Sequence, residues 1–290
     1  MIDAGSWEEL YREAARRLGD RDGARWMVEE ASGERLGTAV GAPPEKARRR
    51  MADMVARREA GEPLQYVLGT WSFRRLELMV DHRVLIPRPE TEQVVEAALR
   101  ELDRLDGAGA SGSGQRATVV DLGTGSGAIA LSVVRERTAV EVWATDSSPG
   151  AVAVARANLS GLAGFAATRV RVVEGNWWEA LPGDLRRRID LVVSNPPYIS
   201  TAEMAGLDAS VADWEPRAAL EAGPAGTEAL EYLITTAPAW LRPGGTLVLE
   251  MAPHQAGVLS GIAGRAGFAE VEVVPDLAGK ARGLVARGAP

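Results

Sequence analysis

A short polar segment with two consecutive prolines is the feature of the sequence that most directly suggests chemistry. The run Asp190–Ser194 predicts a buried strand, and Asn195-Pro196-Pro197-Tyr198 follows it at once. Two prolines cannot continue a central strand and they fix the backbone, so the Asn195 side-chain oxygen and the Pro196 carbonyl become two rigid acceptors for one –NH2 group. Such acceptors would align the nitrogen lone pair with a methyl donor and stabilise the positive charge that grows on nitrogen, with Tyr198 packed against the planar group. A plain turn is the alternative.

A glycine-rich turn earlier in the chain is a second candidate for ligand binding. The segment Asp121-Leu122-Gly123-Thr124-Gly125-Ser126-Gly127 follows a predicted strand and opens a predicted helix. Glycines let the backbone turn tightly and approach a ligand, and a helix N-terminus offers free N–H groups. The spacing matches neither G-x-G-x-x-G nor the phosphate loop G-x-x-x-x-G-K. By itself the turn could hold a dinucleotide, a phosphate or nothing. We interpret it as a nucleoside-binding turn made by Gly123, Thr124, Gly125, Ser126 and Gly127.

Residues at the ends of the next two predicted strands fit the parts of a nucleoside. Asp146 ends the second strand, where a carboxylate can accept hydrogen bonds from both ribose hydroxyls. The alternative is a role as helix N-cap, because Ser147 and Ser148 also look like a helix start. Asn176 and Trp177 follow the third strand, and there an amide can pair with an adenine edge while an indole stacks on its face. Two adjacent tryptophans could instead simply cap the core.

Alternating strands and helices after residue 116 predict the scaffold that would hold these residues. The predicted strands are Ala117–Leu122, Val140–Thr145, Arg169–Val173, Asp190–Ser194, Thr246–Glu250, Glu270–Val274 and Gly283–Ala286. Helical patterns lie at 127–137, 149–160, 228–241 and 254–265. This order predicts an α/β fold with a seven-stranded, Rossmann-like and mostly parallel sheet covered on both faces. Ligands of such sheets bind at the carboxyl ends of the strands, which is where each of the segments above falls.

The first sixty residues read as helices. Ser6 and Glu9 form a capping box, a second helix fits Asp22 to Ala31, and a third begins at Pro43-Pro44. From Leu64 to Ile86 the pattern changes to short extended pieces that predict a hairpin. We therefore divide the chain into a helical substrate-docking module at 1–63, a β-hairpin linker at 64–86 and an α/β domain at 87–290.

Charge and composition limit the function classes. A net charge of −7 and a pI near 5.2 argue against broad binding to nucleic acid backbones. The absence of cysteine excludes disulfides and thiolate metal sites, and the two histidines, His82 and His254, have no ligand pattern near them, so no metal site is predicted. With no signal peptide and no long apolar run, we expect a soluble cytoplasmic protein without membrane contact. The third helix is basic, from Lys46 to Arg58, and forms either a solvated face or a docking surface for RNA or an acidic partner.

The motifs, taken together, resemble the HemK-type peptide chain release factor glutamine N5-methyltransferase family. The resemblance covers nearly the whole chain and rests on GEPLQYVLG at 61–69, IPRPETE at 86–92, DLGTGSGAIAL at 121–131, NPPYIS at 195–200, WEP at 214–216, PGG at 243–245, and Asp276, Gly279 and Arg282. Methyltransferases of amino groups in DNA share the NPPY segment, but the combination with IPRPETE and GEPLQY is specific. The resemblance implies a small helical domain, a hairpin linker and a class I methyltransferase domain.

The resemblance also implies a donor site for S-adenosyl-L-methionine. Gly123 to Gly127 would surround its methionine part, Asp146 would hold its ribose, and Trp177 would lie by its adenine. Asn176 stands where the family commonly has Asp, so this adenine contact brings no charge. Asn195 would also lie beside the donor.

The substrate glutamine would bind along the NPPY segment. The resemblance gives Asn195, Pro196 and Tyr198 catalytic roles and adds Pro197 to the substrate contacts. Arg88 and Glu92 match the family's motif at the edge of the active site, although a first-turn carboxylate such as Glu92 could equally favour the helix dipole.

The expected activity is methyl transfer to the glutamine of the Gly-Gly-Gln loop in class I release factors. We expect a monomer that works in one in-line step, without a metal or a covalent enzyme intermediate, and without direct contact to nucleic acid. A ribosomal protein glutamine stays open as the substrate, because it presents the same amide. Two further hypotheses are methylation of a nucleobase amino group in DNA or RNA, and a non-catalytic partner-binding protein that keeps a methyltransferase shell.

Overall fold

The chain folds into two compact units. The computed structural model describes residues 5–107, 116–162 and 164–289. One unit is Met1–Trp71 together with Asp208–Trp214, and the other is Ser72–Leu207 together with Glu215–Pro290. Every candidate site residue from the sequence belongs to the second unit.

The first unit is a helical bundle. Its helices are α1 (Trp7–Leu18), α2 (Arg21–Ser32), α3 (Glu45–Glu59) and α4 (Leu64–Leu68), with α8 (Ala209–Ala212) from the later segment. Leu10, Met27 and Met51 lie in their shared core and are fully buried. On α3, Arg50 pairs with Glu30 and Arg57 with Glu62, so part of its basic face is neutralised by glutamates of the same unit.

The start of α1 differs in detail from the predicted capping box. The Ser6 hydroxyl accepts a hydrogen bond from the Glu9 N–H at 3.2 Å, as predicted. The Glu9 carboxylate, however, accepts from the N–H of Gly5 at 2.6 Å, and not from that of Ser6. The cap therefore reaches one residue further back along the chain.

Helix α4 corrects the prediction that the chain is extended from residue 64 onward. Pro63 accepts a hydrogen bond from the Val67 N–H at 3.1 Å, and Gly69 ends the turn with a φ of 81°. A short apolar run can form a strand or a buried helical turn, and the flanking proline and glycine decide for the helix here. The predicted hairpin follows it as β1 (Thr70–Phe73) and β2 (Leu76–Met79).

The second unit is built on one sheet. Over the described residues its strand order is β10-β11-β9-β6-β3-β4-β5. The strands are β3 (Ala117–Leu122), β4 (Val140–Asp146), β5 (Val170–Glu174), β6 (Ile189–Ser194), β9 (Leu241–Glu250), β10 (Phe268–Pro275) and β11 (Ala281–Gly288). β3, β4, β5, β6 and β9 run parallel, and β11 pairs antiparallel with β9 and β10. The predicted seven-stranded α/β fold is confirmed.

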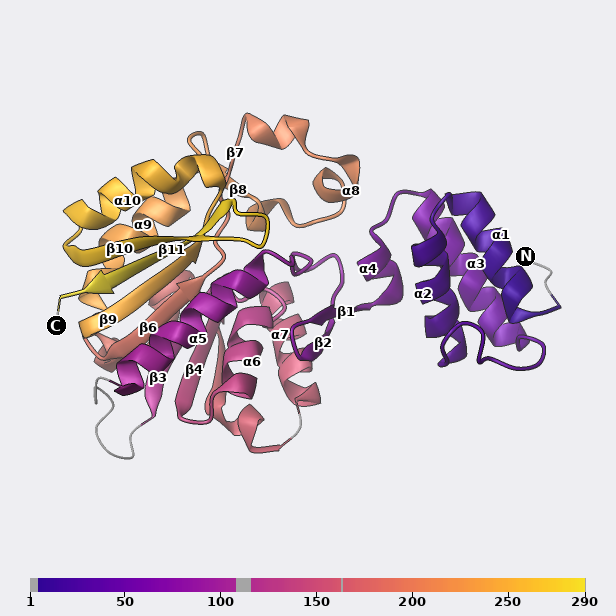
Figure 1. Cartoon of the computed structure of the whole chain (residues 1–290), viewed down its shortest axis with the longest axis horizontal. Helices are drawn as coiled ribbons and strands as arrows, with labels where there is room; N and C mark the ends of the chain where they lie inside the picture. Colours follow the sequence, from indigo (N-terminus) through magenta and orange to yellow (C-terminus); the bar gives the residue numbers. More distant parts are fainter. Residues whose placement is uncertain (1–4, 108–115, 163, 290) are drawn as a thin grey trace. The chain divides into compact units, whose positions relative to one another are not determined.

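Helices cover both faces of this sheet (Figure 1). They are α5 (Thr91–Gly107), α6 (Ala128–Glu136), α7 (Pro149–Gly161), α9 (Glu228–Thr236) and α10 (Ala256–Arg265), and a small pair of strands, β7 (Ile199–Ser200) and β8 (Glu221–Gly223), stands apart from the sheet. Leu233 of α9 and Leu259 of α10 enter one core with Leu122 and Leu247 of the sheet. None of the described helices is long and apolar enough to cross a bilayer.

Two boundaries differ from the predicted ones because of prolines and glycines. Helix α9 ends at Thr236 and not at residue 241, since Pro238 opens a separate 3-10 turn. Strand β9 begins at Leu241 and not at Thr246, because a register shift opposite Ile189 lets the strand run through Pro243-Gly244-Gly245.

Candidate functional site

A cavity opens at the carboxyl ends of four parallel strands of the second unit. The glycine turn after β3, the last residue of β4, the residues after β5 and the first residue after β6 all contribute to its wall. The predicted site residues on this wall are Gly123, Thr124, Gly125, Ser126, Asp146, Asn176, Trp177, Asn195 and Pro197. Residues of four separate predicted segments are thus brought together, as expected for strands that end at one edge of a parallel sheet.

The glycine turn is held from beneath by a buried carboxyl group. The Asp121 carboxylate accepts hydrogen bonds from the Thr124 hydroxyl at 2.6 Å and from the Ala130 N–H at 3.1 Å. Burial raises the pKa of Asp121 to about 7. Gly123 and Gly125 take φ angles of 75° and 56°, which turn the backbone along the cavity wall.

Gly127 does not lie on this wall, contrary to its predicted place in the ligand-binding turn. It is the N-cap of α6, with a φ of 86°. A Cβ atom at this position would stand 3.1 Å from Leu131 Cδ1. Its role is therefore to start the helix closely packed beneath the turn.

Asp146 connects the glycine turn to the next helix. One of its oxygens accepts from the Gly125 N–H and the other from the Ser148 N–H, each at 2.9 Å. The N-cap of α7 is Ser148, whose hydroxyl accepts from the Ala151 N–H, so the alternative that Asp146 caps this helix is wrong. Burial raises the pKa of Asp146. Each carboxylate oxygen keeps lone-pair capacity for a hydroxyl group in the cavity.

The two adjacent tryptophans have different surroundings. Trp177 has a φ of 46° and lies on the cavity wall, where its ring comes within 3.6 Å of the position that a Cβ atom on Gly123 would take. Trp178 is buried, stacks on Trp240 at a ring separation of 5.4 Å, and donates to the Thr236 hydroxyl at 2.7 Å. The core interpretation is therefore right for Trp178, while Trp177 is available to a planar ligand.

The residues of the NPPY segment also differ in their surroundings. Asn195 and Pro197 are on the cavity wall, whereas Pro196 and Tyr198, both predicted to be catalytic, are not. Pro196 is buried, and the Tyr198 hydroxyl donates to Glu250 Oε1 at 3.2 Å. Burial raises the pKa of Tyr198. The tyrosine is thus engaged beside the cavity by a protein group.

Arg88 and Glu92 adjoin Pro87 and Thr91 of the cavity wall, and each is engaged by a protein group. Arg88 pairs with Glu215, a buried carboxylate that also accepts from the Ile86 N–H at 3.1 Å and precedes Pro216 on the cavity wall. Glu92 accepts from the Arg74 N–H at 3.0 Å, where Arg74 turns the β1–β2 hairpin with a φ of 49°. Both residues anchor neighbouring segments and neither is part of the wall.

Thr91 and Glu250 are residues of the site that the sequence reasoning missed. Thr91 is on the cavity wall, and its hydroxyl donates to Glu250 Oε2 at 2.6 Å. The Asn195 amide nitrogen donates to the Thr91 hydroxyl at 3.3 Å. Burial raises the pKa of Glu250 to about 7. In the sequence, Thr91 lies within the motif IPRPETE, and the signal for Glu250 is a single acid at the end of the apolar strand TLVLE.

Comparison with known proteins agrees with this geometry. The family model "methyltransferase small domain" matches residues 107–210. A release factor glutamine methyltransferase of Cereibacter sphaeroides is 42% identical over 84% of this chain and 81% of its own length. One of Gloeobacter violaceus is 40% identical over 97% of this chain and 96% of its own length. The chain belongs to the release factor glutamine methyltransferase family.

Solved structures support the same fold. The hMettl16 catalytic domain in complex with the MAT2A 3′UTR hairpin 6 has a TM-score of 0.56 and 14% identity over 84% of this chain and 81% of that one. Membership of the release factor glutamine methyltransferase family confirms the predicted enzyme class. The hypothesis of a non-catalytic methyltransferase shell is therefore not supported.

Proposed function

We propose that this protein transfers a methyl group from S-adenosyl-L-methionine to the side-chain amide nitrogen of the glutamine in the Gly-Gly-Gln loop of class I release factors. The observation that carries the proposal is the single cavity wall shared by the glycine turn, Asp146, Trp177 and Asn195. Relatives named for this activity, 42% and 40% identical over most of the chain, support the choice of substrate.

The residues of the cavity fit the parts of the proposed donor. Asp146 is a half-buried acceptor for a ribose diol, Trp177 offers an aromatic face, and Asn176 offers an amide for an adenine edge. The glycine turn brings backbone atoms to the wall without side chains in the way. When bound, the donor would supply the methyl group from its positively charged sulfur and leave as S-adenosylhomocysteine, and the methylated amide nitrogen would lose one proton to water.

Asn195 would hold the substrate amide. Its nitrogen is engaged by Thr91, so its side-chain oxygen is the atom left to accept an N–H of the substrate glutamine. An acceptor fixed in advance favours the positive charge that develops on an amide nitrogen as it is alkylated. Pro197 limits the backbone movement of this segment.

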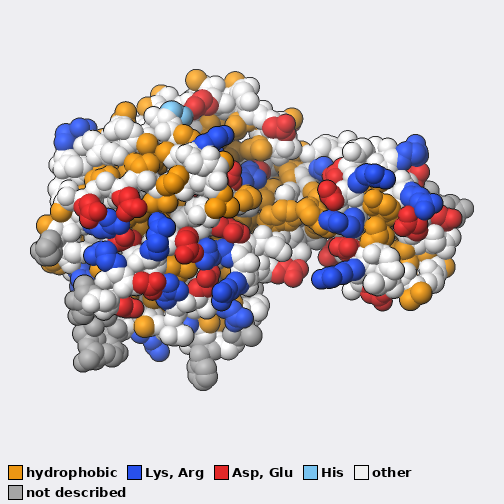
Figure 2. All heavy atoms as spheres, viewed as in Figure 1, with side chains coloured by type: hydrophobic (Ala, Val, Ile, Leu, Met, Phe, Trp, Pro, Cys, Tyr) orange, Lys and Arg blue, Asp and Glu red, His pale blue; other side chains and the backbone are white. Residues whose placement is uncertain are grey.

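A nucleobase substrate is less well supported. Acidic and basic side chains alternate over the face of the sheet-containing unit seen in Figure 2, with no broad basic area on that face. Binding to a nucleic acid backbone would call for such an area. The likeness to hMettl16, at 14% identity, concerns the fold alone.

The test is transfer of a labelled methyl group to recombinant release factors. We expect label in a factor with an intact Gly-Gly-Gln loop and none in a Gln→Asn variant of that loop. A nucleic acid duplex serves as the competing substrate. Equal labelling of the Gln→Asn factor, or labelling of the duplex in its place, would contradict the proposal.

A further inference from the structure

We infer that Glu250 is a positioning residue of this active site, which fixes the side-chain amide of Asn195 through the hydroxyl of Thr91. The inference rests on the proposed function, in which the Asn195 oxygen accepts a hydrogen bond from the substrate amide. It gives a role to a buried acid that none of the sequence motifs contains.

The three side chains come from distant parts of the chain. Thr91 is the first residue of α5, Asn195 follows β6, and Glu250 is the last residue of β9. β6 and β9 are parallel neighbours in which Ser194 pairs with Leu249, so Asn195 and Glu250 continue adjacent strands at the same level. Thr91 bridges them with contacts of 3.3 Å to Asn195 and 2.6 Å to Glu250.

The donors and acceptors available fix the direction of the hydrogen bonds that link Asn195, Thr91 and Glu250. Above the pKa of Glu250 the ionised carboxylate can only accept, so Thr91 donates its single hydroxyl hydrogen to Glu250. The Thr91 oxygen is then left as an acceptor, and an acceptor can be matched only by the NH2 group of Asn195. The amide oxygen is therefore turned away from Thr91.

Without the carboxylate the direction is no longer fixed. Once the Thr91 hydroxyl no longer bonds Glu250, it can donate to the Asn195 oxygen. The side-chain amide would then be rotated by half a turn, with its NH2 group toward the substrate nitrogen. Two donors would then face each other, and the substrate amide would lose its acceptor. Glu250 thus selects the productive one of two amide orientations.

Tyr198 ties the same carboxylate to the other end of the NPPY segment. Its hydroxyl donates to Glu250 Oε1 at 3.2 Å, and its backbone carbonyl accepts from Gln255 Nε2 at 2.9 Å. Gln255 is buried and also bonds the Gly226 carbonyl. Residues 250 to 255 therefore hold the segment at two points, and the Glu250 carboxylate reaches both Thr91 and Tyr198.

The experiment compares four single variants of the full-length protein and the double variant Glu250→Leu/Thr91→Val. Glu250→Leu removes the acceptor, Thr91→Val removes the relay and keeps the side-chain shape, and Thr91→Ser restores the hydroxyl. Glu101→Gln is the matched control, because Glu101 is a buried carboxylate of the same helix that bonds Arg104, Thr246 and Arg287 and does not line the cavity. For each variant, kcat and KM with a release factor, the donor Kd by calorimetry, and Tm are measured.

We expect Glu250→Leu and Thr91→Val each to lower kcat by about 10- to 100-fold, with the donor Kd changed by less than about 2-fold, since a displaced reacting group costs rate and not donor binding. The double variant should be no slower than the worse single one, because both break the same chain. Thr91→Ser should recover most of the rate, and Glu101→Gln should change Tm without changing kcat. A normal kcat in Thr91→Val, or parallel losses of Tm and donor affinity in Glu250→Leu, would overturn the inference.

Nuclear magnetic resonance tests the orientation independently of turnover. In the unaltered protein the Asn195 side-chain NH2 protons should show contacts to Thr91, and these should disappear in Glu250→Leu. If the unaltered enzyme leaves release factors unmethylated but shows these contacts, the proposed function fails and the positioning role stands. Absence of the contacts in the unaltered protein would contradict the positioning role itself.

Discussion

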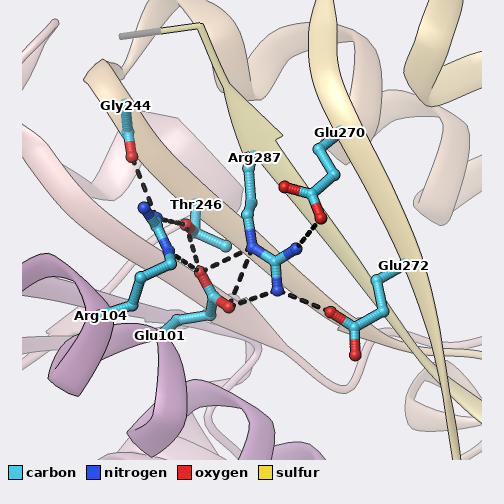
Figure 3. A network of polar contacts seen from close by, with 7 residues as sticks. All are labelled: Glu101, Arg104, Gly244, Thr246, Glu270, Glu272 and Arg287. Atoms are coloured by element: carbon cyan, nitrogen blue, oxygen red, sulfur yellow. Dashed lines mark hydrogen bonds and ion pairs between the residues drawn. The ribbon is translucent and has the colours of Figure 1, made fainter.

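The pair formed by α5 and β9 contains two buried carboxylates with opposite surroundings. At one end Glu101 accepts from Arg287 at 2.6 Å, from Arg104 at 2.7 Å and from the Thr246 hydroxyl at 3.1 Å, in the network drawn in Figure 3. At the other end Glu250 accepts from the hydroxyls of Thr91 and Tyr198. Among the hydrogen bonds of the described residues, arginines reach Glu101 and only neutral donors reach Glu250.

The pKa values move in opposite directions as a result. Burial by itself raises the pKa of Glu101, but the hydrogen bonds and charges of Arg287 and Arg104 outweigh it and the net pKa is lowered. Burial dominates at Glu250 and raises its pKa to about 7. An acid whose charge is balanced by arginine stabilises the framework, whereas a buried acid without a bonded cation costs stability when ionised. Such a residue beside a cavity is a candidate for function.

The largest expected effect is on stability and concerns the arginine contacts of Glu101. Arg287→Ala leaves the buried Glu101 with Arg104 and the Thr246 hydroxyl as partners and removes the bonds to Glu270 and Glu272. We expect a loss of about 3 to 5 kcal/mol in the free energy of unfolding, measured by denaturant titration, because a buried pair has lost one partner. The turnover per folded molecule should stay near normal. A variant as stable as the parent would contradict the framework role.

The next effect concerns the cavity end. Asn195→Ala removes the proposed acceptor of the substrate amide and should lower kcat by about 100-fold or more, on the scale of one preorganised polar contact. Donor binding by calorimetry should fall much less, and the free energy of unfolding should change little. Turnover close to normal in this variant would refute the assigned role of Asn195.

The pH dependence of stability should separate the two carboxylates. Because the folded-state pKa of Glu250 is raised from 4.5 to about 7, its contribution to stability is complete below about pH 4.5 and is lost as the pH rises through about 7. The free energy of unfolding of Glu250→Gln should therefore rise relative to that of the parent over this pH range, by up to about 3 kcal/mol. Asp121 has the same direction of shift and is present in both proteins, so the difference between them isolates Glu250.

Glu101→Gln should show the opposite sign. The lowered pKa of Glu101 means that its contribution is present above the unfolded-state pKa and is lost as the pH falls through the folded-state value. The parent and Glu101→Gln should thus converge in acid, as measured by urea unfolding at a series of pH values. Identical slopes of the free energy of unfolding against pH for Glu250→Gln and Glu101→Gln would contradict the comparison.

Several neighbouring groups act on the charge of Glu250. They are Thr91, Tyr198, Arg282 and Glu90.

The smallest effect concerns the part of the cavity proposed to bind S-adenosyl-L-methionine. Asp146→Asn keeps the size of the side chain but replaces one acceptor oxygen by a donor that faces either the Gly125 or the Ser148 N–H. We expect the Kd of S-adenosylhomocysteine, the product that shares the ribose and adenine of the methyl donor, to rise by about 10-fold, the cost of weakening a hydrogen bond to a charged group. Calorimetry measures this Kd. An unchanged Kd would remove Asp146 from the donor site.

The sequence predicted the parts of this structure that local patterns determine. Apolar runs predicted β3 with the bounds that the structure shows, Ala117–Leu122. The motif residues follow the ends of strands, and a parallel sheet brings those ends to one edge. Local ambiguity explains the error at α4, where LQYVL fits a strand as well as a helix until Pro63 and Gly69 are weighed.

The remaining misses depend on contacts between distant residues. Thr91 and Glu250 are separated by 159 positions, and no spacing rule connects the start of a helix to the end of the fifth predicted strand. The same holds for Tyr198, whose motif suggested a substrate contact while its hydroxyl bonds Glu250. Only the pairing of β6 with β9 brings these side chains together.

The most direct test of the proposed activity is tandem mass spectrometry of a release factor after incubation with S-adenosyl-L-methionine and enzyme. We predict one added methyl group on the glutamine of the Gly-Gly-Gln loop with the unaltered enzyme and with Glu101→Gln, and a rate reduced by about 100-fold or more with Asn195→Ala. A methyl group on another residue, or equal rates for the unaltered enzyme and Asn195→Ala, would contradict it.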